Sequence, residues 1–164
     1  AARYQAELAN GFGNLASRVI AMVGKYCDGV VPASGEATDA ELGIQKTVAE
    51  LNSIYKSTAA LWEKDTNPEG FTWLVGNDGA ANVVAFARWD ENASSLVSVT
   101  NFSPVPHENY QLPFPNAGIW REVMNTDDLA YGGSGISNEQ LVVGASQMAS
   151  VRIPPLATVW FKRS

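Results

Sequence analysis

Hydrophobic residues recur with helical spacing in the first third of the chain. Between residues 3 and 27 the apolar positions are separated by alternating steps of four and three, which places them on one stripe of an amphipathic helix. These positions are Leu8, Phe12, Leu15, Val19, Met22 and Tyr26. Asp28-Gly29 and then Pro32 end the helix, because glycine suits the left-handed C-terminal position and proline cannot continue the hydrogen bonding.

A second helix is predicted from Thr38 to about Lys56. It begins with a capping-box pattern, in which Thr38 and Glu41 can each accept a hydrogen bond from the other's backbone N–H. Its apolar stripe is Ile44, Val48, Leu51 and Tyr55. Because only a short loop separates the two helices, they are expected to form an antiparallel hairpin.

After residue 66 the pattern changes to short apolar runs separated by turns rich in Pro, Asn and Gly. The runs predict strands at 71–75, 83–89, 96–102, 109–114, 118–124, 141–145, 149–153 and 156–162. Such spacing is typical of a sandwich or barrel. The predicted fold class is therefore α+β: an N-terminal antiparallel helical hairpin packed on a C-terminal all-β sandwich of about eight strands. Packing would hide the apolar stripe of the first helix from water.

Composition narrows the functional classes. The chain has 164 residues, 46% hydrophobic and 17% charged, which is typical of a globular protein. Its formal net charge of −6 disfavours binding to a phosphate backbone. With one cysteine (Cys27) and one histidine (His107), neither an intrachain disulfide nor a Cys/His zinc site is expected. No apolar stretch approaches the ~20 residues of a membrane helix, and residues 1–10 lack signal-peptide features. No cofactor, membrane or obligatory partner is predicted.

Tryptophan provides the main candidate chemistry, since an indole ring can stack on a sugar. The candidates for sugar stacking are Trp62, Trp73, Trp89 and Trp120. Aromatic residues on strands also fill the core of a sandwich, so core packing is the competing interpretation. Asp127 and Asp128 are interpreted as solvated turn residues, and the glycine-rich run 132–135 as a turn, because it lacks the Lys-Ser/Thr of a phosphate-binding loop.

Residues 3–32 resemble the start of the anticodon-binding helical domain of bacterial methionyl-tRNA synthetases. The resemblance rests on Asn14-Leu15-Ala16-Ser17-Arg18 and on Lys25-Tyr26 followed by Asp28-Gly29, and it extends to about residue 43. In that family the Asn and Arg of the first motif help to read the anticodon. The resemblance therefore implies vestigial RNA contacts at Asn14 and Arg18.

Residues 44–164 resemble the C-terminal part of 1,4-α-glucan (glycogen) branching enzymes. The matching stretches are 51–56, 60–65, 68–73, 101–106, 125–127 with 131–135, and 153–160, and residues 136–148 match less well. That family carries its catalytic carboxylates on a separate barrel domain, so the resemblance implies no catalytic residue here, and the chain is not expected to be an enzyme.

The two resemblances, 1–43 and 44–164, meet near residues 42–46, inside the second predicted helix. They imply a chimera, made or selected, that folds as one unit without evolved activity. The alternatives are a weak glucan-binding module and a residual tRNA-binding fragment. Both families are cytoplasmic, so a cytoplasmic location is expected. Self-association, for example as a dimer, is expected if strand edges remain exposed.

Overall fold

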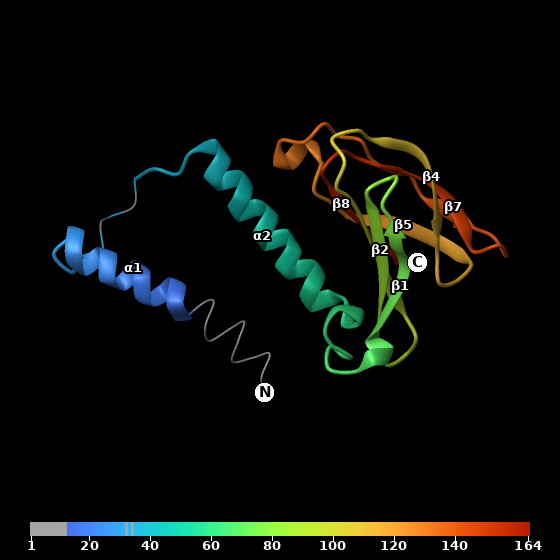
Figure 1. Ribbon diagram of the computed structural model, residues 1–164, viewed down its shortest axis with the longest axis horizontal. Coiled ribbons are helices and arrows are strands. Elements are labelled where there is room, and N and C mark those ends of the chain that lie inside the picture. The colour runs from blue at the N-terminus through green and yellow to red at the C-terminus, as the bar shows by residue number, and fades with distance from the viewer. Residues whose placement is uncertain (1–12, 32, 34) are drawn as a thin grey trace. The chain divides into compact units, whose positions relative to one another are not determined.

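The computed structural model describes residues 13–31, 33 and 35–164, and it divides the chain into two compact units with a boundary between Thr38 and Asp39 (Figure 1). The first unit contains helix α1 (Gly13–Tyr26). The second, Asp39–Ser164, contains helix α2 (Asp39–Ser57), eight strands and three short 3-10 helices: η2 (Ala59–Leu61), η3 (Pro68–Gly70) and η4 (Leu129–Tyr131).

Helix α1 confirms the described part of the first predicted helix. Its C-terminal turn closes where expected, since Asp28 and Gly29 have φ values of 51° and 78° and the Gly29 N–H donates to the Val23 carbonyl at 3.1 Å. Residues 3–12 of the prediction, with Leu8 and Phe12, lie outside the described residues, as does the Leu15 side chain. The packing of this helix on the sheets stays a prediction.

Helix α2 was predicted at nearly its observed length. It begins directly after Thr38, runs unbroken through residues 42–46 and has no buried residue. Its apolar stripe is half exposed, with Val48 and Tyr55 at 49% and 47%. The chain then turns through η2, which contacts strands β2 and β3, while α2 itself contacts η4.

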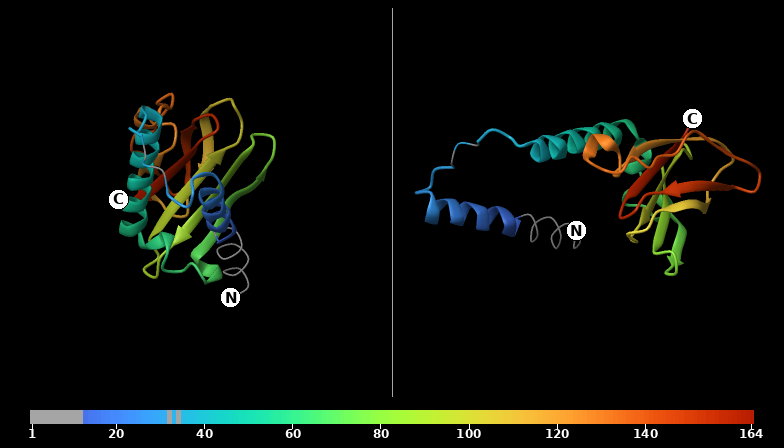
Figure 2. Two further views of the ribbon diagram at one scale, coloured as in Figure 1. Left: turned by 90° about the vertical axis from the view of Figure 1, so that its left-hand side faces the viewer. Right: turned by 90° about the horizontal axis from the view of Figure 1, so that it is seen from above.

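The strands form one six-stranded and one two-stranded antiparallel sheet. The larger sheet has the order β1-β2-β3-β8-β5-β6, and the smaller pairs β4 with β7. Their bounds are β1 (Phe71–Asp78), β2 (Val83–Trp89), β3 (Ser95–Asn101), β4 (His107–Pro113), β5 (Gly118–Asn125), β6 (Leu141–Val143), β7 (Met148–Ile153) and β8 (Thr158–Arg163). The strands lie close together, and α2 lies beside them (Figure 2). The predicted sandwich of about eight strands is thus confirmed.

The core lies between the two sheets. Strict alternation places Ala85 and Ala87 of β2 opposite Val99 and Val97 of β3, and all four are fully buried. The smaller sheet supplies Leu112, Val151 and Ile153 to the same cluster. The intervening side chains, such as Phe86 and Arg88, therefore lie on the opposite, outer face of the larger sheet.

Candidate functional site

Three aromatic rings gather on the outer face of β1 and β2. Phe71 and Trp73 are two residues apart on β1, and Trp73 pairs with Phe86 of β2. The Phe71 and Phe86 rings stack at a centroid distance of 5.2 Å, and Trp73 meets both edge-on, at 4.9 Å and 6.2 Å. Such contacts restrain an indole ring, because edge-to-face pairs are favourable geometries. Trp73 nevertheless remains 60% exposed.

The local structure of β1 explains this exposure. The register between β1 and β2 shifts between Trp73 and Val75, which is a β-bulge. The bulge lets Leu74 and Val75 both pack against the core, while Trp73 lies with Phe86 on the outer face. A Cβ at Gly76 would lie 3.6 Å from the Trp73 ring, so the indole lies against the backbone there. Trp73 is a large, restrained and exposed aromatic surface.

The turn that joins β1 to β2 is held by Asp78. One carboxylate oxygen accepts from the Tyr110 hydroxyl at 2.7 Å and the other from the Ala81 N–H at 3.1 Å. The hydrogen bond from Tyr110 and, to a smaller extent, the hydrogen bond from Ala81 lower the pKa of Asp78. Burial raises the pKa of the Tyr110 hydroxyl, and the hydrogen bond to the Asp78 carboxylate raises it further. His107, which begins β4, lies with Nε2 3.0 Å from the Ala81 carbonyl, so the turn is fixed from two strands.

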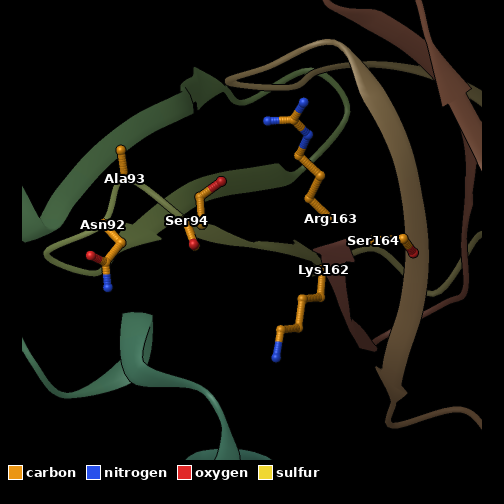
Figure 3. A pocket seen from close by; sticks show the side chains of 7 residues that line it. Asn92, Ala93, Ser94, Lys162, Arg163 and Ser164 are labelled. Atoms are coloured by element: carbon orange, nitrogen blue, oxygen red, sulfur yellow. The ribbon is translucent and has the colours of Figure 1, made fainter.

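A hollow lies between the β2–β3 loop and the end of β8. It has a volume of about 350 Å³, and its lining includes Ser94, Lys162 and Arg163 (Figure 3). The loop is held by Asp90, which accepts hydrogen bonds from the Asn92 and Ser94 N–H groups. Lys162 and Arg163 point away from each other in Figure 3, as successive residues of a strand must. Their charges therefore do not converge on one ligand, and this hollow is the weaker candidate.

The other predicted stacking residues have different roles. Trp62 follows η2, is 42% exposed, and its Nε1 donates to the Tyr55 carbonyl at 3.1 Å. Trp89 is half-buried against the core, and its Nε1 donates to Thr72 Oγ1 at 3.0 Å. Trp120 is fully buried, so stacking of a sugar on it is a wrong prediction: its ring packs against Phe114, and its Nε1 donates to the Asn116 carbonyl. Core packing outweighs binding at that position.

Asp127 also departs from the prediction. It is only 9% exposed, and its carboxylate accepts hydrogen bonds from the Ser134 hydroxyl and from the Ser134 and Ile136 N–H groups. Burial alone would raise the pKa of Asp127, but these bonds and that of Gly135 outweigh it and hold the pKa below its usual range. The Asp127 carboxylate thus closes the loop between residues 127 and 136 by hydrogen bonding to its far end. Asp128 is exposed, as predicted, and caps η4.

The residues predicted for RNA contact lie on α1. The side chain of Asn14 is outside the described part of the chain, and Arg18 is exposed. In the described residues, no group of three or more His, Cys, Asp or Glu side chains could hold a metal ion. No described helix combines the length and apolarity needed to cross a membrane.

Sequence reasoning missed Phe71 and Phe86 as partners of Trp73. The i, i+2 spacing of Phe71 and Trp73 on one strand was an available signal, because such residues share a face. Phe86 could not be added without the register between β1 and β2, which a bulge makes irregular.

Comparison with known proteins places this sandwich in a family. Residues 73–164 match the model of the alpha amylase C-terminal all-beta domain. The chain belongs to this family. The matched domain is not the catalytic domain of alpha-amylase-type enzymes, which agrees with the prediction that catalytic residues lie elsewhere.

The relatives of this chain include 1,4-alpha-glucan branching enzymes. That of Thermobifida fusca is 42% identical over 126 residues, covering 72% of this chain and 17% of the relative. That of Burkholderia vietnamiensis is 43% identical over 128 residues, covering 74% and 18%. The chain therefore spans about a sixth of the length of these relatives. An alpha-amylase structure from H. orenii, 17% identical, aligns over 73% of this chain and 20% of its own with a TM-score of 0.46.

Proposed function

We propose that this chain is a glucan-binding module of branching-enzyme type, with Trp73 as its principal sugar contact. The observation that carries the proposal is that Trp73 is 60% exposed although three neighbours restrain it. A flat apolar surface that is held in place suits the C–H face of a sugar ring, because little side-chain freedom is lost on binding. The branching-enzyme relatives, whose names specify a 1,4-alpha-glucan, support a glucan as ligand.

Replacing Trp73 by alanine is expected to weaken binding to soluble glycogen by about tenfold, since an exposed aromatic contact is removed. Affinity electrophoresis in gels with increasing glycogen measures this directly. Trp73→Phe should retain part of the affinity. Val142→Ala is a control, because Val142 is 75% exposed on β6 at the opposite edge of the sheet. Full retention of affinity in Trp73→Ala would refute the assignment of the site.

Trp62 is a secondary candidate for the same module. It is exposed, but its Nε1 is already bonded to the Tyr55 carbonyl, and none of the ring contacts that restrain Trp73 involves it. Trp62→Ala in the same gels tests whether the glucan reaches this turn. A smaller effect than that of Trp73→Ala is expected.

The synthetase-like segment and the chimeric origin remain a hypothesis. The relatives described above cover 72–74% of the chain, and the family model begins at residue 73, so this support concerns the branching-enzyme-like part. We expect no retention of tRNA at physiological salt, because the net charge is −6. Salt-dependent tRNA binding that is lost in Asn14→Ala or Arg18→Ala would instead support an RNA-binding remnant.

A further inference from the structure

A hollow of about 300 Å³ lies at the β1–β2 turn. Gly76, Asn77, Asn82, Val84 and Phe102 contribute to its wall. Phe102 follows directly on β3 and is 62% exposed. The Phe102 N–H donates to the Asn82 carbonyl at 2.9 Å, which joins the two sides of the hollow. The hollow thus combines an exposed aromatic ring with two amide side chains.

This hollow is continuous with the Trp73 surface. Gly76 lines the hollow, and the Trp73 indole lies against the same glycine. On β2, Val84 lines the hollow, and Phe86, two residues further on the same face, contacts the Trp73 ring. From Phe86 to Val83, the first residue of β2, the strand rises by about 10 Å, and Asn82 and Phe102 lie beyond that end. The surface from Trp73 to Phe102 is therefore long enough for more than one sugar ring.

The polar groups of the hollow suit a neutral ligand with many hydroxyls. In the described part of the chain, the side-chain amides of Asn77 and Asn82 make no hydrogen bond to another protein group, so they are available as donors and acceptors. The Asp78 carboxylate is occupied on both oxygens, by Tyr110 and Ala81. Its negative charge disfavours an anionic ligand at this position.

The walls of the hollow are fixed before any ligand binds. Asn101, next to Phe102, is fully buried, and its Nδ2 donates to the carbonyls of Val105 and Pro154 at 2.8 Å and 3.0 Å. On the other side, Asp78 is held by Tyr110. A prearranged site binds with a smaller entropic cost than one that must be ordered.

We infer that the hollow at Phe102 is a second subsite, which binds the continuation of the same α-glucan chain that stacks on Trp73. This inference rests on the proposed function. Short glucans need only the Trp73 surface, whereas longer glucans reach the Asn82 and Phe102 side chains as well. The module therefore prefers long chains through contacts at the β1–β2 turn.

Isothermal titration calorimetry with maltotriose and maltoheptaose tests the inference. Phe102→Ala is expected to weaken maltoheptaose binding by about tenfold and to leave maltotriose binding within about twofold. Asn82→Gly should weaken maltoheptaose binding by about fivefold. Glycine accepts the left-handed backbone of Asn82 (φ 55°), so the turn is kept. Leu129→Ala, at a side chain that is 73% exposed on η4, should change neither affinity.

Three variants separate the two proposals. If Trp73→Ala weakens both glucans while Phe102→Ala and Asn82→Gly match the wild type, the second subsite is refuted and the glucan-binding function stands. If Trp73→Ala changes neither affinity, the assignment of the site to Trp73 is refuted, and the second subsite, which continues from it, fails with it. If the unsubstituted protein binds neither glucan, the proposed function itself fails. Equal weakening of both glucans by Phe102→Ala would also overturn the length preference.

Discussion

Replacing Trp120 by alanine is expected to lower the free energy of unfolding by about 3–5 kcal/mol, the usual cost of removing a large buried aromatic side chain. Trp120 is 0% exposed and lies 5.0 Å, between ring centroids, from Phe114. Phe114 in turn meets Phe161 at 5.7 Å, so one cavity would disturb residues of β5, β8 and the segment after β4. The Asn116 carbonyl would also lose the indole N–H.

Urea unfolding followed by far-UV circular dichroism measures this loss. Trp73→Ala is the matched control, because it removes the same side chain from a 60% exposed position. Its effect on stability should be below about 1 kcal/mol. The two substitutions then separate the buried Trp120, which stabilises the fold, from the exposed Trp73, which is the proposed ligand contact. A Trp120→Ala variant as stable as Trp73→Ala would contradict the core assignment.

The strands could be predicted because alternation is a local signal. The prediction of 83–89 coincides with β2, and the bounds of the other seven predicted strands differ from the observed ones by one to three residues at one end or both. The roles of the tryptophans could not be predicted in the same way. Trp73 and Trp120 both lie on apolar strands, but Trp73 is on an edge strand with a bulge, whereas Trp120 pairs with both β6 and β8. Whether a strand lies at the edge or in the centre of a sheet depends on the strand order, which is a property of the whole sheet.

The Asp127 loop shows a second limit. Two adjacent aspartates before a glycine-rich run are typical of a solvated turn, and only Asp128 fits that pattern. The donors to Asp127 come from Ser134 and Ile136, seven and nine residues later, so the hydrogen bonding depends on how the loop returns. Gly133 allows that return, because a Cβ there would collide with the backbone of Asp127.

Asp127→Asn is expected to lower the free energy of unfolding by about 2–3 kcal/mol at neutral pH. The amide nitrogen of asparagine would face N–H donors that now point at a carboxylate oxygen, and the charge-assisted bonds would be lost. Asp128→Asn is the matched control. Asp128 is exposed, and asparagine caps a helix as well as aspartate does, so its effect should be small.

The effect of Asp127→Asn should also depend on pH. Because the folded-state pKa of Asp127 lies below that of an unfolded aspartate, about 3.9, the folded protein holds this carboxyl deprotonated more strongly. The stabilisation is complete above about pH 5 and is lost as the pH falls through 3.9 towards the folded-state pKa. Unfolding measured from pH 7 to pH 3 should therefore show wild type and Asp127→Asn converging in acid. A stability difference that stays constant over this range would mean that packing, and not the ionised carboxylate, holds the loop closed.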